Sequence, residues 1–335
     1  MNIHDIARES GVSTATVSRV INSPDLVKEA TKNRVMRVIK ANAYTPNALA
    51  RSLLHNRTLS IGVLTVDILN PYYATVVHSI ERNLSAYGYS ILLCSTGGNY
   101  QEKAKYIKTL LEKRVDGLVF VGSVYQEKDG SNEILAASHV IPIIMINSII
   151  EAENIYCILC DDRKGIRVAL NYLFDAGRSR ILFINSATTT SALLKEDEFR
   201  KYMVSHAITE EMFHIIETST DCLQDLPKFI AEAFSKHAYE AILASDDLFA
   251  NVAVNTLHNL HLPIPDSVWV IGYNNSYISD QTFPRLSSID SRIMDIGVKT
   301  AEILVDILSN NTIHQRIQYL SPGLVIKESS GTALH

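Results

Sequence analysis

A short segment near the N-terminus carries side chains that could form hydrogen bonds with an external partner. Thr14, Ala15 and Arg19 fall on the polar side of a helix predicted over residues 14–21, whose other side is apolar. An arginine guanidinium can donate two hydrogen bonds to O6 and N7 of guanine, and the first turns of such a helix reach base edges in the major groove. Arg19 could therefore contact a DNA base if this helix entered the major groove. The alternative is a polar helix face turned to solvent.

Sequence patterns that support catalysis or metal binding are missing. There is no G-x-G-x-x-G, no G-x-x-x-x-G-K-[ST], no H-E-x-x-H and no G-x-S-x-G. The carboxylate pairs Asp161/Asp162 and Asp246/Asp247 come at predicted helix starts, where the helix dipole favours them. The C-x-x-C at residues 157–160 has no second cysteine pair to complete a zinc site. We expect no enzymatic activity, no cofactor and no metal.

The charge is divided unevenly along the chain. Residues 1–57 carry nine Lys or Arg against four Asp or Glu, a net charge of +5, and the remainder carries 22 against 32, a net charge of −10. A basic head on an acidic body is typical of a modular DNA-binding protein. The 335 residues are 47% hydrophobic, enough for two or three globular domains. Because neither a membrane span nor a signal peptide is recognisable, we expect a cytoplasmic protein.

The basic head is predicted to be helical. Residues 3–10 and 14–21 read as two helices joined by the turn Gly11-Val12-Ser13, with Ser13 or Thr14 capping the second. Thr31 is predicted to cap a third helix that runs to about Ala41. A further helical pattern over residues 47–54 is too short to be stable alone.

From residue 59 onward, predicted strands and helices alternate in two successive series. The strands of the first series fall at 60–66, 90–94, 117–121 and 142–147, and those of the second at 156–160, 180–185, 213–217, 241–244 and 268–272. A last helix at 293–308 and strands near 316–319 and 323–327 follow. The alternation predicts two doubly wound parallel sheets. Ligands of such sheets bind beyond the strand carboxyl ends, here in a cleft between two lobes.

The sequence resembles the LacI/GalR (lactose and galactose repressor) family almost throughout. The likeness is clearest in the head, IHDIARESGVSTATVSRVINSPDLVKEATKNRVMRVIKANAYTPNALARSL. It continues in SIGVLTVDILNPYYATVVHSIE, DDRKGIRVALNYLFDAGRSRILFIN, LASDDLFANVAVNTLHNL, PIPDSVWVIGYNNSYISD and FPRLSSIDSRIMDIGVKTAEIL, in that order. The body alone is also similar to periplasmic sugar-binding proteins.

The resemblance implies an N-terminal all-α helix-turn-helix head plus an α/β periplasmic-binding-protein-like body of two doubly wound parallel-sheet subdomains. The head would span 1–45, a hinge helix and linker 46–58, and an effector-binding and dimerisation domain 59–335. Within that domain, the N-subdomain would comprise 60–160 and 290–322, and the C-subdomain 161–289 and 323–330.

The resemblance also assigns DNA contacts. The base-contacting residues would be Thr14, Ala15 and Arg19. The phosphate-contacting residues would be Ser13, Thr16 and Ser18. The hinge residues in the minor groove would be Asn47, Ala50 and Leu53. Leu53 would act as a wedge that kinks the duplex at a central C–G step, unless it packs on its own dimer partner instead. Leu54 departs from the family, which often has lysine or another polar residue there.

A second set of residues would line the effector cleft. By resemblance these are Tyr72, Tyr73, Asn147, Lys195, Asp246 and Asn274. One of the two tyrosines would stack on the ligand, unless both are core aromatics. Asn147 and Asn274 replace aspartates that are common in the family, and Lys195 replaces an arginine. Two lost carboxylates and a retained cation make an acidic or phosphorylated sugar a plausible effector. Asp246 could equally serve only as a helix cap.

We therefore expect a homodimeric repressor of a carbohydrate-utilisation operon. It would bind a near-palindromic operator on double-stranded DNA under control of a sugar, a sugar acid or a sugar phosphate. Activation instead of repression and a protein co-repressor both stay open. The competing readings are a sugar-binding protein used only for uptake, which needs no basic head, and an α/β enzyme such as a sugar isomerase, which needs a catalytic constellation.

Overall fold

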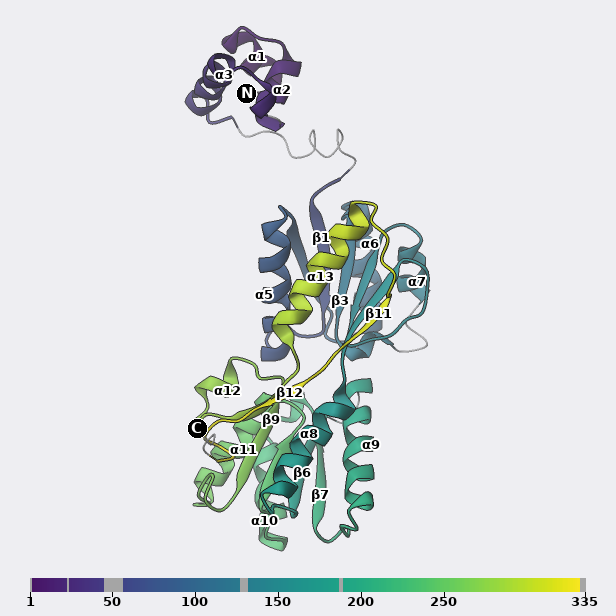
Figure 1. Cartoon of the computed structure of the whole chain (residues 1–335), viewed down its shortest axis with the longest axis vertical. Helices are drawn as coiled ribbons and strands as arrows, with labels where there is room; N and C mark the ends of the chain where they lie inside the picture. Colours follow the sequence, from purple (N-terminus) through teal and green to yellow (C-terminus); the bar gives the residue numbers. More distant parts are fainter. Residues whose placement is uncertain (1, 23, 45–56, 127–131, 187–188, 332–335) are drawn as a thin grey trace. The chain divides into compact units, whose positions relative to one another are not determined.

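The computed structural model describes residues 2–22, 24–44, 57–126, 132–186 and 189–331. Contacts divide the chain into two units, Met1–Leu59 and Ser60–His335. The smaller unit is helical and the larger is built on two sheets (Figure 1). Among the described residues, none of the helices combines the length and the apolar character needed to cross a bilayer.

The N-terminal unit packs three helices around a small apolar core. They are α1 (Ile3–Ser10), α2 (Thr14–Asn22) and α3 (Glu29–Ala41), with a 3₁₀ turn η1 (Pro24–Leu26) between the last two. The side chain of Asn2 caps α1 by accepting from the amides of His4 and Asp5. Gly11 ends α1 with a left-handed backbone (φ 62°), which turns the chain into α2. The core residues are Ile6, Ala7, Val17, Val20 and Val35.

The two predicted caps in this unit have different outcomes. Ser13 caps α2 as predicted, because its hydroxyl accepts from the amide of Thr16 at 3.2 Å. The prediction that Thr31 caps the third helix is wrong, because α3 already begins at Glu29. The carbonyl of Lys28 accepts from the amides of Thr31 and Lys32, so the backbone alone starts this helix and no side chain caps it.

The first sheet of the larger unit has six parallel strands in the order β11-β5-β4-β3-β1-β2. The strands are β1 (Ser60–Thr65), β2 (Ser90–Ser95), β3 (Gly117–Val121), β4 (Ile143–Ile146), β5 (Ile155–Cys160) and β11 (Ile317–Leu320). One face is covered by α5 (Pro71–Ala86) and α13 (Ile293–Leu308), the other by α6 (Tyr100–Glu112) and α7 (Asn132–Ser138). Figure 1 shows α13 running beside α5.

The second sheet has the order β12-β10-β9-β8-β6-β7. Its strands are β6 (Ile181–Ser186), β7 (Phe213–Thr218), β8 (Ala241–Ala244), β9 (Trp269–Tyr273), β10 (Ser287–Asp290) and β12 (Gly323–Val325). Helices α8 (Asp162–Asp175) and α9 (Thr190–Ser205) cover one face, and α10 (Leu226–Lys236) and α11 (Asp247–Asn259) the other. The edge strand β12 runs antiparallel to β10, so this sheet is mixed.

Each sheet forms a lobe with the helices that cover it, and the lobes are called first and second after their sheets. Some elements of the second lobe differ from the sequence prediction. Helix α9 begins at Thr190 rather than at Lys195, because the Thr189 hydroxyl caps it by accepting from the amide of Ala192. Strand β10 and the short helix α12 (Ile278–Gln281) were not predicted. The buried residues of β10 include Ser287 and Ser288, so the strand lacks the apolar pattern by which buried strands are recognised.

Three connections join the two sheets, and all lie at the same edge. The chain leaves the first sheet after β5, returns after β10, and crosses again from β11 to β12. Ser321, in the third connection, accepts from Nε of Arg292 on its carbonyl at 3.0 Å and from Nζ of Lys164 on its hydroxyl at 2.7 Å. Arg292 belongs to the second connection and Lys164 follows the first. Hydrogen bonds therefore fasten the three connections to one another.

Candidate functional site

The exposed face of α2 carries the residues predicted to contact DNA bases. Because Val17 and Val20 are buried against the other helices, Ala15 and Arg19 are exposed on the opposite side and Thr14 is half-buried. Within the described part of the chain, no hydrogen bond or ion pair holds the Arg19 guanidinium. It is therefore available to an external acceptor.

The residues predicted to contact phosphates lie at the start of the same helix. The Ser13 and Thr16 hydroxyls are 3.0 Å apart and hydrogen bonded, and Ser18 is half-buried one turn further on. The predicted hinge residues Asn47, Ala50 and Leu53 lie outside the described residues.

A polar cleft of about 520 Å³ lies between the two sheets of the larger unit. Its walls are loops that follow strands of both sheets and the first turns of the helices that come after them, as the ends of parallel strands require. All of the residues predicted to bind an effector line this cleft, namely Tyr72, Tyr73, Asn147, Lys195, Asp246 and Asn274. Serine, threonine and aspartate are frequent among the other lining residues, so the cleft can bind hydroxyl groups. Among the described residues, no cluster of His, Cys, Asp or Glu could hold a metal ion.

The first lobe contributes two tyrosines, one of which is hydrogen bonded to an asparagine. The Tyr72 hydroxyl accepts from Nδ2 of Asn147 at 2.7 Å, and Oδ1 of Asn147 accepts from the amide of Cys160 at 3.1 Å. Asn147 is thus already engaged within the protein, between the ends of β4 and β5. Tyr73 packs edge-on against Tyr72, with ring centroids 5.2 Å apart. Burial raises the pKa of both tyrosines, so their hydroxyls stay protonated.

The second lobe contributes Asp246 and Asn274. Asp246 caps α11 by accepting from the amide of Leu248 at 2.8 Å, and its other oxygen accepts from Nδ2 of Asn274 at 3.0 Å. Burial raises the pKa of Asp246 to about 6, and the hydrogen bond from Leu248, the nearby Lys195 charge and the hydrogen bonds from Asn274 and Asn70 oppose that rise. Asp246 therefore serves as a helix cap and as a wall of the cleft at once.

Lys195 is enclosed by the second lobe. Its Nζ lies 3.6 Å from Oδ1 of Asp162, donates to the carbonyl of Ser245 at 3.2 Å, and sits 3.7 Å from the centroid of the Tyr273 ring. Asp162 also accepts from the hydroxyls of Tyr273 at 2.9 Å and Ser191 at 2.6 Å. Across the cleft, the amide of Ser191 lies 3.4 Å from the Ser123 hydroxyl of the first lobe.

Sequence reasoning did not select Asp162, Ser191 or Tyr273, all of which line the cleft. Asp162 was interpreted only as an acid favoured by a helix dipole. Tyr273 directly precedes Asn274 at the end of a buried strand, and the carboxyl end of a parallel strand is where ligands bind. The position of Tyr273 at the end of this strand could therefore have identified it as a cleft residue from the sequence.

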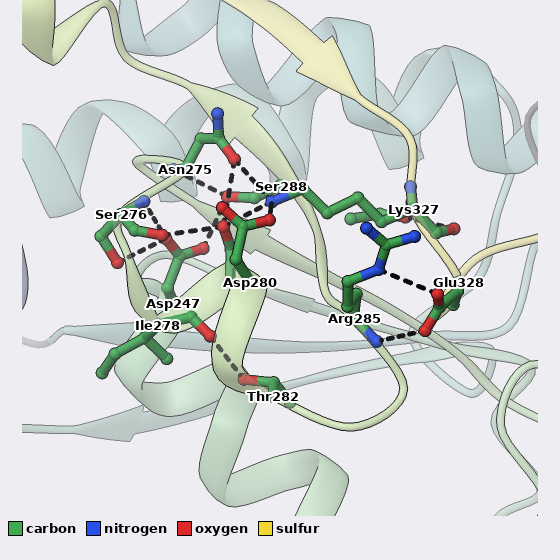
Figure 2. A network of polar contacts seen from close by, with 12 residues as sticks. Asp247, Asn275, Ser276, Ile278, Asp280, Thr282, Arg285, Ser288, Lys327 and Glu328 are labelled. Atoms are coloured by element: carbon green, nitrogen blue, oxygen red, sulfur yellow. Dashed lines mark hydrogen bonds and ion pairs between the residues drawn. The ribbon is translucent and has the colours of Figure 1, made fainter.

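Behind the cleft, Asp247 links α11 to the loop after β9 and to β10 (Figure 2). One oxygen of this fully buried carboxylate accepts from the amide of Ser276 at 2.6 Å and from its hydroxyl at 2.8 Å. The other accepts from the Ser288 hydroxyl at 2.5 Å, which in turn accepts from the amide of Asn275 at 2.9 Å. The carboxylate thus fixes the loop that carries Asn274.

Lys327 holds the same loop from a second direction (Figure 2). Its Nζ donates to Oδ1 of Asn275 at 3.0 Å and to the Ser279 hydroxyl at 2.7 Å, and pairs with Asp280 at 2.7 Å. The support is needed because Asn274 and Asn275 both have positive φ, 97° and 48°, a region that non-glycine residues rarely occupy. Asn274 therefore presents its side chain to the cleft from a fixed backbone.

Two family descriptions match the chain. Residues 2–47 match "Bacterial regulatory proteins, lacI family", and residues 58–323 match "Periplasmic binding proteins and sugar binding domain of LacI family".

Individual proteins match over nearly the full length. The chain is 33% identical to an HTH-type transcriptional regulator of Lachnoclostridium phytofermentans, over 98% of this chain and 99% of that protein. It is 30% identical to the HTH-type transcriptional repressor PurR of Photobacterium profundum, over 98% of both. Its fold matches the Lac repressor dimer bound to operator and the anti-inducer ONPF with a TM-score of 0.83, at 21% identity over 98% of this chain and 99% of that chain.

Replacement of Asp247 by asparagine should change the pH dependence of stability. Burial, followed by the neighbouring Asp246 charge, raises the pKa of Asp247 from 3.8 to about 7, although its hydrogen bonds from serines oppose the rise. The folded state therefore binds this proton more tightly than the unfolded state. The resulting stabilisation is complete below pH 3.8 and is lost as the pH rises through about 7.

The measurement is urea unfolding of the wild type and Asp247→Asn from about pH 4 to about pH 8. The variant loses acceptors, which shifts its stability by an amount independent of pH. In addition to that offset, the wild type should lose stability relative to the variant as the pH rises. The loss should be about 1.4 kcal/mol for each unit by which the pKa of Asp247 is higher in the folded state than in the unfolded state. Parallel stability curves for the two proteins would show that Asp247 does not titrate in this range.

Proposed function

Since the chain belongs to the LacI family of bacterial regulatory proteins and is a DNA-binding transcriptional regulator, we propose that it is a repressor controlled by a small sugar-like molecule. The observation that carries the proposal is the combination of an exposed Arg19 on α2 with a polar cleft of about 520 Å³ in the same chain. A sugar-binding protein used only for uptake has no use for the first feature, and the relatives that match over nearly the full length are named transcriptional regulators and not enzymes.

The DNA-binding form would be a homodimer on a near-palindromic operator. One head of three helices presents a single α2, which covers few base pairs, whereas two heads contact two half-sites. The Lac repressor of similar fold binds its operator as a dimer, which supports this arrangement. We further propose a head at 1–45, a hinge at 46–58 and an effector domain at 59–335, in which Leu53 of the hinge wedges into the minor groove.

The effector would bind between Tyr73 of the first lobe and Asp246 and Asn274 of the second. A flat ring at Tyr73 suits the apolar face of a sugar. A ligand that contacts both lobes stabilises the closed arrangement over the open one, and only such a difference in affinity can shift the equilibrium. The closed population would then alter the spacing of the two heads and hence operator affinity.

A second candidate effector is a planar nitrogenous base. Relatives named repressor PurR match nearly the whole chain, and a tyrosine ring can stack on a base as well as on a sugar. The two candidates differ in the polar groups that they offer: a sugar presents hydroxyls around its ring, whereas a base presents donors and acceptors in one plane. Binding assays with both classes separate them.

Arg19→Ala should weaken operator binding by about 1–3 kcal/mol and relax the preference at one base pair of each half-site, because a bidentate contact to guanine is lost. The measurement is a gel-shift titration on a near-palindromic operator to which the wild type binds and on versions of that operator with single base-pair changes. Arg37→Ala removes an equal charge from the exposed face of α3 and serves as the control. It should lower affinity for all sequences alike, if at all. Unchanged base preference in Arg19→Ala would refute the base contact.

Leu53→Ala should reduce DNA bending and remove most of the specific affinity for the operator, because alanine is too short to hold two base pairs apart. The bend angle is measured by circular permutation of the operator within a fragment. Leu54→Ala, one residue further along, is the matched control and should preserve the bend. A mutant complex bent as strongly as the wild-type complex would rule out the wedge.

Tyr73→Ala should weaken effector binding about tenfold through loss of the stacking surface. The effector is first identified by thermal shift among neutral sugars and nitrogenous bases, and its affinity is then measured by calorimetry. Tyr87, exposed at the other end of α5, provides the control Tyr87→Ala. Equal effector affinity in Tyr73→Ala and Tyr87→Ala would show that Tyr73 does not stack on the ligand.

A further inference from the structure

The charges that line the cleft are unequal in number. The described lining residues include four carboxylates and a single cation, namely Asp67, Asp162, Asp221, Asp246 and Lys195. An anionic ligand would therefore have to pair with Lys195 or remain beside uncompensated negative charge. The class of ligand that the cleft accepts depends on whether the Lys195 ammonium is available.

Protein groups already surround that ammonium. The side chain of Lys195 is 8% exposed, and Nζ has three protein partners: the Asp162 carboxylate, the Ser245 carbonyl and the face of the Tyr273 ring. An ammonium has three N–H donors. The Ser245 carbonyl accepts from one of these donors, the Asp162 carboxylate supplies the opposite charge, and the Tyr273 ring covers a further side of the ammonium.

Asp162 is held in place independently of Lys195. It accepts hydrogen bonds from the hydroxyls of Ser191 and Tyr273, and its own side chain is 9% exposed. The position of Tyr273 is in turn fixed by packing, because a Cβ on Gly165 would lie 2.4 Å from its hydroxyl oxygen. Only glycine at 165 lets Tyr273 reach Asp162. The carboxylate therefore cannot move aside easily to release Lys195 to a ligand.

We propose that Asp162 is a specificity-determining residue, whose carboxylate masks the Lys195 ammonium and so directs the cleft to uncharged, hydroxyl-bearing ligands and away from acidic or phosphorylated ones. The proposal rests on the proposed function and names the ligand class of the same cleft. Hydroxyl groups can donate to Asp246 and exchange hydrogen bonds with Asn274 without a counter-charge. A phosphate would compete with Asp162 for Lys195 at the cost of leaving a buried carboxylate unpaired.

According to the proposal, Lys195 could bind an anion if Asp162 did not mask it, so removal of the Asp162 charge should create an anion site. The probe is inorganic phosphate, titrated by calorimetry into the full-length wild type, Asp162→Asn and Asp162→Asn/Lys195→Met. Asparagine keeps an acceptor for Tyr273 and a donor for Ser191, but it removes the carboxylate with which Lys195 forms its ion pair. Asp162→Asn should therefore bind phosphate about tenfold or more tightly than the wild type. The double variant should lose this gain.

The control for net charge is Asp175→Asn, which removes a carboxylate from the exposed end of the same helix α8 and should give no gain. Equal phosphate affinity in the wild type and a folded Asp162→Asn would overturn the proposal, and so would a gain that persists in the double variant. If Asp162→Asn does not fold, the proposal is tested by comparing phosphate binding by the wild type and by Lys195→Met. Phosphate binding by the wild type that Lys195→Met abolishes would prove the ammonium unmasked, whereas no measurable binding by either supports the mask.

The phosphate titration also separates this proposal from the proposed function. If no sugar or base binds the wild type, the effector hypothesis fails. The comparison of phosphate affinities still tests whether Asp162 masks the Lys195 ammonium. If a sugar phosphate proves to be the effector and depends on Lys195, the chain remains a ligand-controlled regulator and only the masking role of Asp162 is wrong.

Discussion

A charged side chain can be removed from water only if it finds a partner, and this constraint shapes the cleft of the protein. Lys195 is paired with Asp162, whereas Asp246 accepts from the amide of Leu248 at the start of α11 and from the side-chain amide of Asn274, with the Lys195 charge nearby. Asp247, one residue further on and fully buried, relies on serine donors and retains a raised pKa. Each solution fixes a neighbouring backbone segment, so that satisfying the charges also shapes the site.

These polar contacts join parts of the chain that are distant in sequence. Asp247 on α11 is bonded to the loop after β9 and to β10, and Lys327, near the end of the described chain, is bonded to that loop as well (Figure 2). The loop carries Asn274, which faces the cleft and donates to Asp246. A change at the cleft wall is therefore coupled through a few hydrogen bonds to the segment that follows β12.

The sequence allowed the architecture to be predicted because its apolar periodicity is strong and the ends of parallel strands meet at one place. That rule, together with the family resemblance, is why residues as far apart as Tyr73 and Asn274 were expected around one cleft. The pairing of Lys195 with Asp162 could not be foreseen, since it depends on side-chain directions across two helices. Strand β10 escaped notice because its buried serines are satisfied by hydrogen bonds and give no apolar signal. The start of α3 was misplaced because a backbone carbonyl, and no side chain, begins that helix.

The position of the three connections between the sheets determines how the lobes can move. The connections follow β5, β10 and β11, at one edge of both sheets, and Ser321 ties them together. Strands β2 and β7 form the opposite edges, and the loops after them, at Gly97–Gly98 and Ser219–Asp221, belong to the cleft wall. A tied band at one side behaves as the pivot of a lever, so a rotation produced by small backbone changes there is greatest at the far edge. For a rotation about this band, the loops after β2 and β7 are therefore the parts of the cleft wall that move furthest.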